Sequence, residues 1–184
     1  MVDPTDAQRL VGDLIREGIV VSVDLDAGTA RVELADDLVT GDIPWLCGRA
    51  GKTRVWSPPA VDEQVTILCP EGDAGRAVIV GSLSSDAHPH AAKDGSTRID
   101  FEDGTWIGYD PGTGELTAHL VSSGRATIVA PGGIRLTGPL TVEGDIDLQG
   151  GMNATGDVIA GGKSLKTHTH TGVQAGAAFS GPPK

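Results

Sequence analysis

The amino-acid sequence predicts an all-β protein with an N-terminal barrel and a C-terminal tapered β-helix. Three observations support this fold class. Glycine accounts for 27 of the 184 residues and aromatic side chains for only six, a balance that suits short strands joined by tight turns. Residues 18–85 contain several short strand-like segments. Residues 132–162 then repeat glycine and apolar residues with a period of six, which is typical of a β-solenoid.

The N-terminal segment, residues 1–17, is expected to contain a helix over positions 5–17. Thr5 or Asp6 can cap this helix. Its apolar stripe is formed by Leu10, Val11, Leu14 and Ile15. The acidic start lacks the basic and apolar regions of a signal peptide, and no segment approaches the ~20 apolar residues of a transmembrane helix. We therefore expect the protein to be made in the cytosol.

Residues 18–85 are predicted to form an OB-type barrel, because five or six short strands in roughly 65 residues suit that fold. The expected strands are residues 18–24, 29–34, 42–47, 54–57, 63–69 and 76–83. Turn sequences such as Asp26-Ala27-Gly28 separate them. Cys47 and Cys69 lie in apolar strand-like segments, where we expect two buried thiols rather than a disulfide.

Residues 86–95 are polar and are expected to form a linker, which includes His88-Pro89-His90. Residues 96–163 are predicted to form the β-helix. Its first part carries the longer segments 97–101, 105–109, 116–121 and 126–129, which we interpret as the wide base of the same rod. His119 alternates with strand residues, and we expect it to be structural.

The six-residue repeat places glycine at Gly132, Gly138, Gly144, Gly150, Gly156 and Gly162. One apolar series is Ile134, Leu140, Ile146, Met152 and Val158, and the second is Leu136, Val142, Leu148, Ala154 and Ala160. Both series have the same parity, so on strands they face one side. Their side chains become smaller towards the C-terminus, and the predicted β-helix therefore tapers.

The length of the repeat predicts the oligomeric state. Five hexads give a single chain fewer than two triangular coils, whereas a solenoid needs roughly three or more stacked units to bury its core. Three chains wound around one axis would supply three faces to each layer. The sequence therefore predicts an intertwined homotrimer with cyclic symmetry.

Residues 164–184 are predicted to form a metal-binding tip with His168 and His170 as ligands. The two side chains share the parity of the inward series, so they face the axis if strand register holds across Gly161-Gly162. Six imidazoles would then converge in a trimer, enough for an octahedral site. Imidazole suits zinc, copper, iron and nickel, and octahedral geometry argues against structural zinc. The alternative is that these histidines, like His88 and His90, are solvated.

The charge and the motifs exclude several classes of function. The net charge is −11, and residues 1–85 hold 14 acidic against 7 basic residues, which argues against a nucleic-acid partner. No phosphate-binding loop, zinc-protease motif or nucleophile elbow is present. We therefore predict no catalytic residue and no enzymatic activity.

The segment Ser164–Val173, with Thr167-His168-Thr169-His170-Thr171 inside it and Gly181-Pro182-Pro183 after it, resembles the baseplate assembly protein V family. These proteins are the central spikes of contractile-tailed phages and related tailocins. The barrel, which ends in Gly81-Ser82-Leu83, is similar to the OB domain of such spikes. The resemblance covers essentially the whole chain.

This resemblance implies a homotrimeric needle at the centre of a tail baseplate, in a virion or tailocin particle. The OB barrels would dock on the baseplate hub protein. His168 and His170 would bind one iron ion per trimer through six histidine nitrogens. On sheath contraction the needle would pierce the bacterial outer membrane. The linker is too short for the lysozyme domain that some phages insert, so no hydrolase is expected.

Three other functions compete with the spike. A trimeric hexapeptide-repeat acyltransferase would need several full coils in each chain. An OB-fold module that binds oligonucleotides is disfavoured by the charge of −7 over residues 1–85. A fibre that binds a receptor carbohydrate would need a broad groove lined by aromatic residues.

Overall fold

The computed structural model describes residues 11–35, 38–169, 172 and 176. The chain divides into two units, Met1–Ile128 and Val129–Lys184. The predicted all-β class is confirmed, because strands make up almost all the regular structure of the described residues. No helix among those residues is long and apolar enough to cross a membrane.

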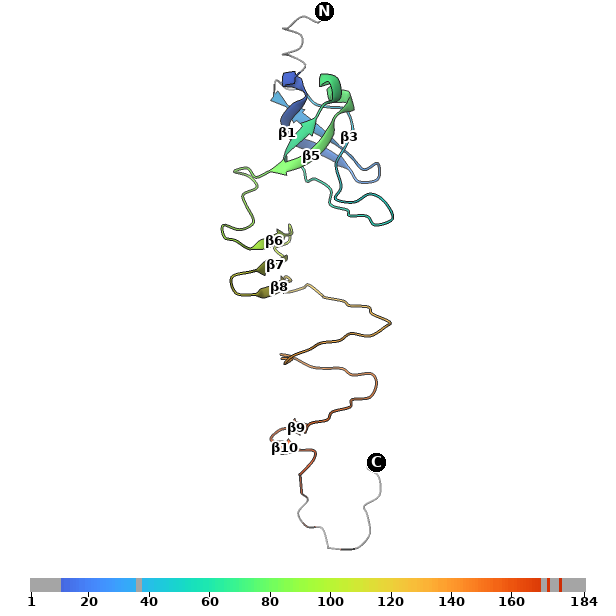
Figure 1. Cartoon of the computed structure of the whole chain (residues 1–184), viewed down its shortest axis with the longest axis vertical. Coiled ribbons are helices and arrows are strands. Elements are labelled where there is room, and N and C mark those ends of the chain that lie inside the picture. The colour runs from blue at the N-terminus through green and yellow to red at the C-terminus, as the bar shows by residue number, and fades with distance from the viewer. Residues whose placement is uncertain (1–10, 36–37, 170–171, 173–175, 177–184) are drawn as a thin grey trace, which may run out of the picture. The chain divides into compact units, whose positions relative to one another are not determined.

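The first unit contains a five-stranded antiparallel barrel (Figure 1). Its strands are β1 (Ile15–Asp24), β2 (Thr29–Leu34), β3 (Ile43–Pro44), β4 (Gln64–Leu68) and β5 (Val78–Leu83), in the order β3-β2-β1-β4-β5. The chain just after β3 reaches β5, where the Leu46 N–H donates to the Ile79 carbonyl over 2.8 Å. This contact closes the sheet, and the predicted OB-type barrel is confirmed.

The barrel core is built from alternate strand residues, because successive side chains point to opposite faces of a strand. Its buried members are Val20, Ala30, Val32, Leu34, Ile43, Trp45, Val65, Ile67, Cys69, Ala77 and Ile79. Gly18 lies where β1 passes close to β2, and a Cβ atom there would stand 2.4 Å from the Glu33 carbonyl oxygen. Only glycine fits this close approach. Two short 3-10 helices, Pro70–Gly72 and Ala74–Arg76, join β4 to β5.

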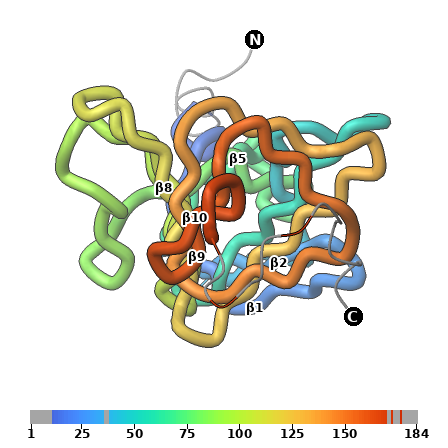
Figure 2. Tube along the Cα trace, turned by 90° about the horizontal axis from the view of Figure 1, so that it is seen from below, coloured from blue at the N-terminus to red at the C-terminus, as the bar shows by residue number. Residues whose placement is uncertain are grey.

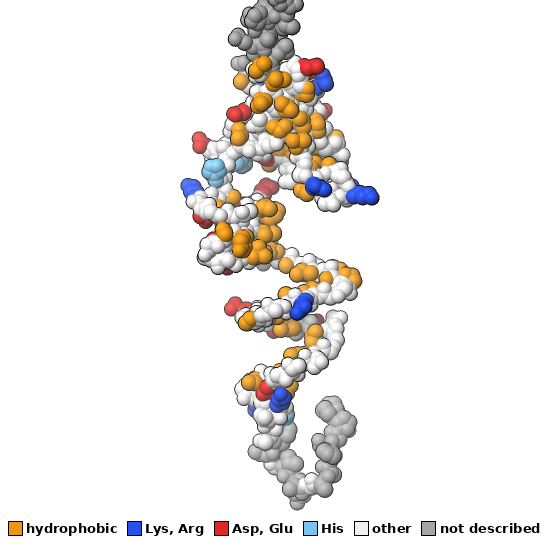
Figure 3. Space-filling model, viewed as in Figure 1, with side chains coloured by type: hydrophobic (Ala, Val, Ile, Leu, Met, Phe, Trp, Pro, Cys, Tyr) orange, Lys and Arg blue, Asp and Glu red, His pale blue; other side chains and the backbone are white. Residues whose placement is uncertain are grey.

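A separate three-stranded meander follows the linker. Its strands are β6 (Thr97–Asp100), β7 (Trp106–Asp110) and β8 (Glu115–His119). The register pairs Asp100 with Trp106 and Trp106 with His119, so these residues share one face. The other face carries Ile99, Ile107, Tyr109, Leu116 and Ala118. The sheet therefore has one polar and one apolar face, and hydrophobic side chains gather over it in Figure 3.

The second unit begins as an open coil. Residues 129–158 form no strand, and their trace winds in wide, extended loops (Figure 2). Gly138, Gly144 and Gly150 have φ angles of 126°, 134° and 151°, and each lies at a bend. The repeated glycines therefore mark corners, as the period predicts. The short strands β9 (Ile159–Ala160) and β10 (Lys163–Ser164) then pair as an antiparallel hairpin.

Several details differ from the sequence prediction. The described part of the helix expected at 5–17 covers residues 11–13, and β1 begins at Ile15 because this residue already pairs with Leu68. Residues 54–57 form no strand; Arg54 makes only an isolated bridge to Ala50. Cys69 is buried as expected, but the expectation that Cys47 is buried is wrong, because this residue lies on the exposed stretch that follows Trp45. Both thiols are free.

Candidate functional site

The tip of the second unit is organised by the turn between β9 and β10. Gly161 and Gly162 have φ angles of 56° and 76°, which fits a two-residue hairpin turn with both central residues left-handed. The pairing continues beyond β10, since the Leu165 N–H donates to the Val158 carbonyl over 2.9 Å. The chain therefore reverses at the two glycines. The premise that strand register holds from the hexads to His168 is wrong.

His168 is held by a tight turn that follows the hairpin. Its main-chain N–H donates to the Ser164 carbonyl over 3.1 Å, and its Nδ1 lies 3.0 Å from the same oxygen. A carbonyl only accepts, so the contact requires a proton on Nδ1, and in the neutral ring the lone pair is then on Nε2. Metal-binding histidines typically have this arrangement, in which the second ring nitrogen donates to a carbonyl or carboxylate. His168 thus fits a metal ligand; His170 lies outside the described residues.

The other histidines are placed elsewhere. His88 and His90 are exposed in the linker, where Nδ1 of His90 lies 2.8 Å from the Ser84 hydroxyl. His119 stacks on Trp106. Within the described part of a single chain, no three His, Cys, Asp or Glu side chains gather closely enough to hold one metal ion.

The surroundings of His168 include Asp157 and Ser164. The Lys166 N–H donates to Oδ1 of Asp157 over 3.1 Å. The pKa of Asp157 is lowered below its ordinary value of 3.8, chiefly by the nearby Ser164 hydroxyl and further by main-chain N–H groups such as that of Lys166. Only the Gly161-Gly162 pair, read as a hairpin turn, could have signalled this contact across nine residues.

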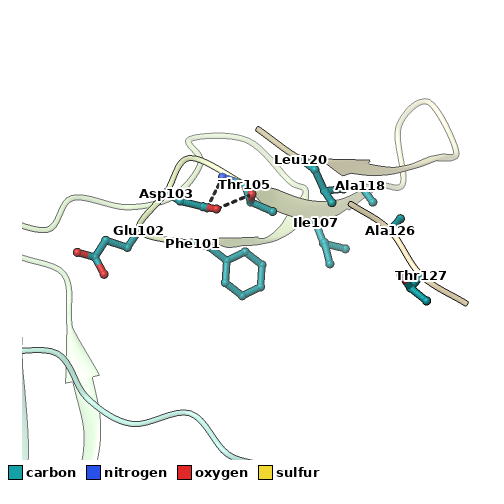
Figure 4. A pocket seen from close by; sticks show the side chains of 9 residues that line it. All are labelled: Phe101, Glu102, Asp103, Thr105, Ile107, Ala118, Leu120, Ala126 and Thr127. Atoms are coloured by element: carbon teal, nitrogen blue, oxygen red, sulfur yellow. Dashed lines mark hydrogen bonds between the residues drawn. The ribbon is translucent and has the colours of Figure 1, made fainter. Parts of the chain in front are cut away.

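The apolar face of the β6–β8 meander opens onto a hollow of about 920 Å³. Phe101, Ile107, Ala118 and Leu120 line it, and Figure 4 shows their side chains pointing to one side of the strands. At its edge, Asp103 accepts hydrogen bonds from the main-chain N–H and the hydroxyl of Thr105. Phe101 and Ile107 remain about half exposed, at 49% and 44%. One chain therefore leaves this face largely uncovered.

The hexad segment shows the same property along its length. The apolar residues at positions 134, 136, 140, 142, 146, 148 and 152 have exposed fractions between 47% and 71%. No main-chain hydrogen bond to another described residue involves positions 134–157. The apolar side chains of this segment are therefore largely uncovered, and its peptide groups have no main-chain partner within the described part of the chain.

Comparisons with known proteins give three matches, two to parts of the chain and one to nearly its whole length. Residues 16–83 match the model of the type VI secretion system/phage-baseplate injector OB domain. Residues 164–184 match the GpV Apex motif, which contains Ser164 and His168. The chain is also 33% identical over 199 aligned positions to the spike protein of Escherichia phage P2, covering 94% of both chains.

Proposed function

The chain belongs to the baseplate spike family of contractile phage tails, and from this premise we propose that three copies intertwine into a membrane-piercing needle. It is a structural tail spike located in the tail baseplate of the virion. The hexapeptide acyltransferase and the oligonucleotide-binding module are not favoured. The proposal concerns how the chains associate, what the tip binds and what the spike does.

The open hexad segment carries the proposal of a trimer. Its 24 residues, 134–157, offer peptide groups that have no main-chain partner within the described chain and a row of largely uncovered apolar side chains. Adjacent strands from other copies would satisfy both, and burying each Leu or Ile side chain stabilises by about 1.5–3 kcal/mol. Three copies fit the triangular period of the repeat. The apolar face of β6–β8 would turn inward in the same assembly.

The tip histidines are proposed to bind iron. Nδ1 of His168 is hydrogen-bonded to the Ser164 carbonyl, and metal-binding histidines typically make such a bond with the ring nitrogen that does not bind the metal. With His170, each chain would supply two imidazoles, and three chains would supply six nitrogens to one iron ion. When bound, the ion would crosslink the tips of the three chains. A different metal with the same geometric preference remains an outcome of the test below.

The other partners follow from the parts of the chain. We propose that the barrel, which matches the injector OB domain, docks on the baseplate hub protein. The needle would then transmit the force of sheath contraction to its tip and pierce the bacterial outer membrane. A rod of chains joined by main-chain hydrogen bonds is stiff along its axis, which suits a load-bearing role. No catalytic residue is assigned.

Native mass spectrometry with metal analysis on the same sample tests this proposal. Leu140→Asp should abolish the trimer, because it places a carboxylate in the shared core, whereas Thr141→Asp on the opposite side of the strand should leave it intact. His168→Ala with His170→Ala should retain the trimer and lose the iron. A monomeric wild-type protein would overturn the intertwined needle.

A further inference from the structure

Several hydrogen bonds hold the turn after the tip hairpin, and they involve residues from Asp157 to His168. On the near side, the Asp157 carboxylate accepts from the Lys166 N–H at 3.1 Å, and the Ser164 hydroxyl is near enough to lower the pKa of this carboxyl group. On the far side, the Ser164 carbonyl receives both the N–H of His168 at 3.1 Å and its Nδ1 at 3.0 Å. Ser164 therefore connects the carboxylate to the imidazole.

The hydroxyl of Ser164 is fixed by more than one contact. It accepts hydrogen bonds from the main-chain N–H and from the hydroxyl of Thr167, each at 2.9 Å. Having accepted two hydrogen bonds, the hydroxyl still has its own proton to donate, and the Asp157 carboxylate is the neighbouring acceptor. The turn over 164–168 is thereby held from both its side-chain and its main-chain atoms, and Ser164 is the residue on which these contacts converge.

We infer that Asp157 and Ser164 are positioning residues for the tip metal, because the Ser164 carbonyl holds the His168 ring and the side chains of Asp157 and Ser164 hold the turn that presents this carbonyl. This inference rests on the proposed role of His168 as a metal ligand. Neither residue touches the metal in this scheme. Hydrogen-bond partners behind a ligand commonly change metal affinity by about 10–100-fold when they are removed, and we expect an effect of that size here.

The chain supplies a matched control for Asp157. Asp145 also follows a hexad glycine, two repeats earlier, and is likewise exposed. No hydrogen bond of its carboxylate to another described residue is seen, whereas that of Asp157 holds Lys166. Asp145→Ala therefore removes a carboxylate from the same place in the repeat without touching the turn that carries His168.

The test measures iron release from the full-length trimer to a chelator, together with the iron X-ray absorption spectrum. Asp157→Ala and Ser164→Ala should each release iron about 10–100-fold faster than the wild type and change the iron–nitrogen signature. Asp157→Asn keeps an acceptor oxygen for the Lys166 N–H and removes the charge of the carboxylate, so it guards against gross misfolding. Asp145→Ala should behave as wild type.

The outcomes separate the two proposals. If the wild-type trimer holds no iron, the metal site itself fails and the inference fails with it. If the wild type holds iron and His168→Ala loses it, but the Asp157 and Ser164 variants remain trimeric and release iron at the wild-type rate, the positioning role is overturned while the metal site stands.

Discussion

The indole ring of Trp106 stacks on the imidazole of His119 across β7 and β8, with ring centroids 6.1 Å apart and an interplanar angle of 23°. On its other neighbouring strand, the guanidinium of Arg98 lies 4.2 Å from the centroid of the Trp106 ring and pairs with Asp100. One aromatic ring thus connects all three strands of the meander on its polar face.

Replacement of Trp106 by Ala should destabilise this meander by about 1–2 kcal/mol, because both the cation–π contact and the ring stack are lost. Chemical denaturation followed by circular dichroism would measure the change. His119→Phe keeps a stacking ring, and we expect its stability to be close to that of the wild type. Equal losses in both variants would contradict a stacking role for His119.

Ile107 tests which face of the meander is covered in the assembly. Ile107→Asp should dissociate the trimer or strongly lower its thermal midpoint, because a carboxylate would be buried among Phe101, Ala118 and Leu120. Thr117→Asp, on the opposite face of the same sheet, is the control and should remain trimeric. Light scattering after size-exclusion chromatography distinguishes them. A trimer that tolerates both substitutions would show that this face is exposed.

Gly18→Ala should destabilise the barrel by about 1–3 kcal/mol, in the range of overpacking substitutions. The added Cβ would meet the Glu33 carbonyl oxygen at 2.4 Å and Cγ1 of Val32 at 2.5 Å, and main-chain atoms cannot rotate away. Gly81→Ala in β5 meets no atom within 4 Å and should be nearly neutral. Thermal unfolding of both variants checks the difference, which would vanish if β1 could shift away from β2.

The carboxylate of Asp157 predicts a dependence on pH. Its pKa is lowered in the folded chain, chiefly by the Ser164 hydroxyl. Its contribution is therefore present above the unfolded value near 3.8 and is lost as the pH falls through the folded pKa. The difference in thermal midpoint between the wild type and Asp157→Asn should accordingly narrow below about pH 4. A difference that stays constant to lower pH would argue against an ionised acceptor.

The barrel could be predicted from the sequence because its strands pair within one chain. Alternation at Val65 and Ile67, or at Val32 and Leu34, directly reflects burial in the core. Arg54–Ser57 contains the strand-favouring residues Val55 and Trp56, yet this segment forms no strand, since Arg54 makes only a local bridge to Ala50. Pattern alone does not distinguish a strand from a loop when the partner strand is missing.

At the tip, the odd or even number of a residue does not predict which way its side chain faces. His168 and the inward apolar series all have even residue numbers. However, Gly161 and Gly162 both adopt positive φ, and the chain reverses direction at these two residues before it reaches His168. The orientation of His168 is instead set by Ser164, four residues earlier. Such a contact depends on the dihedral angles of two glycines, which accept several conformations. The sequence therefore predicted a role for His168 but not the residues that hold it.

Within the described part of the chain, residues 134–157 make no hydrogen bonds between main-chain groups, and this has a consequence for biogenesis. The barrel brings its pairing strands together from within about 70 residues, so it can fold on its own chain, as local contacts favour. In the proposed trimer, the hexad segment instead gains its partners only when chains meet, so its maturation is a concentration-dependent association step. Newly synthesised chains would have a folded barrel and a hexad segment whose apolar side chains are still exposed. Slow assembly at low expression should therefore favour aggregation or proteolysis of that segment.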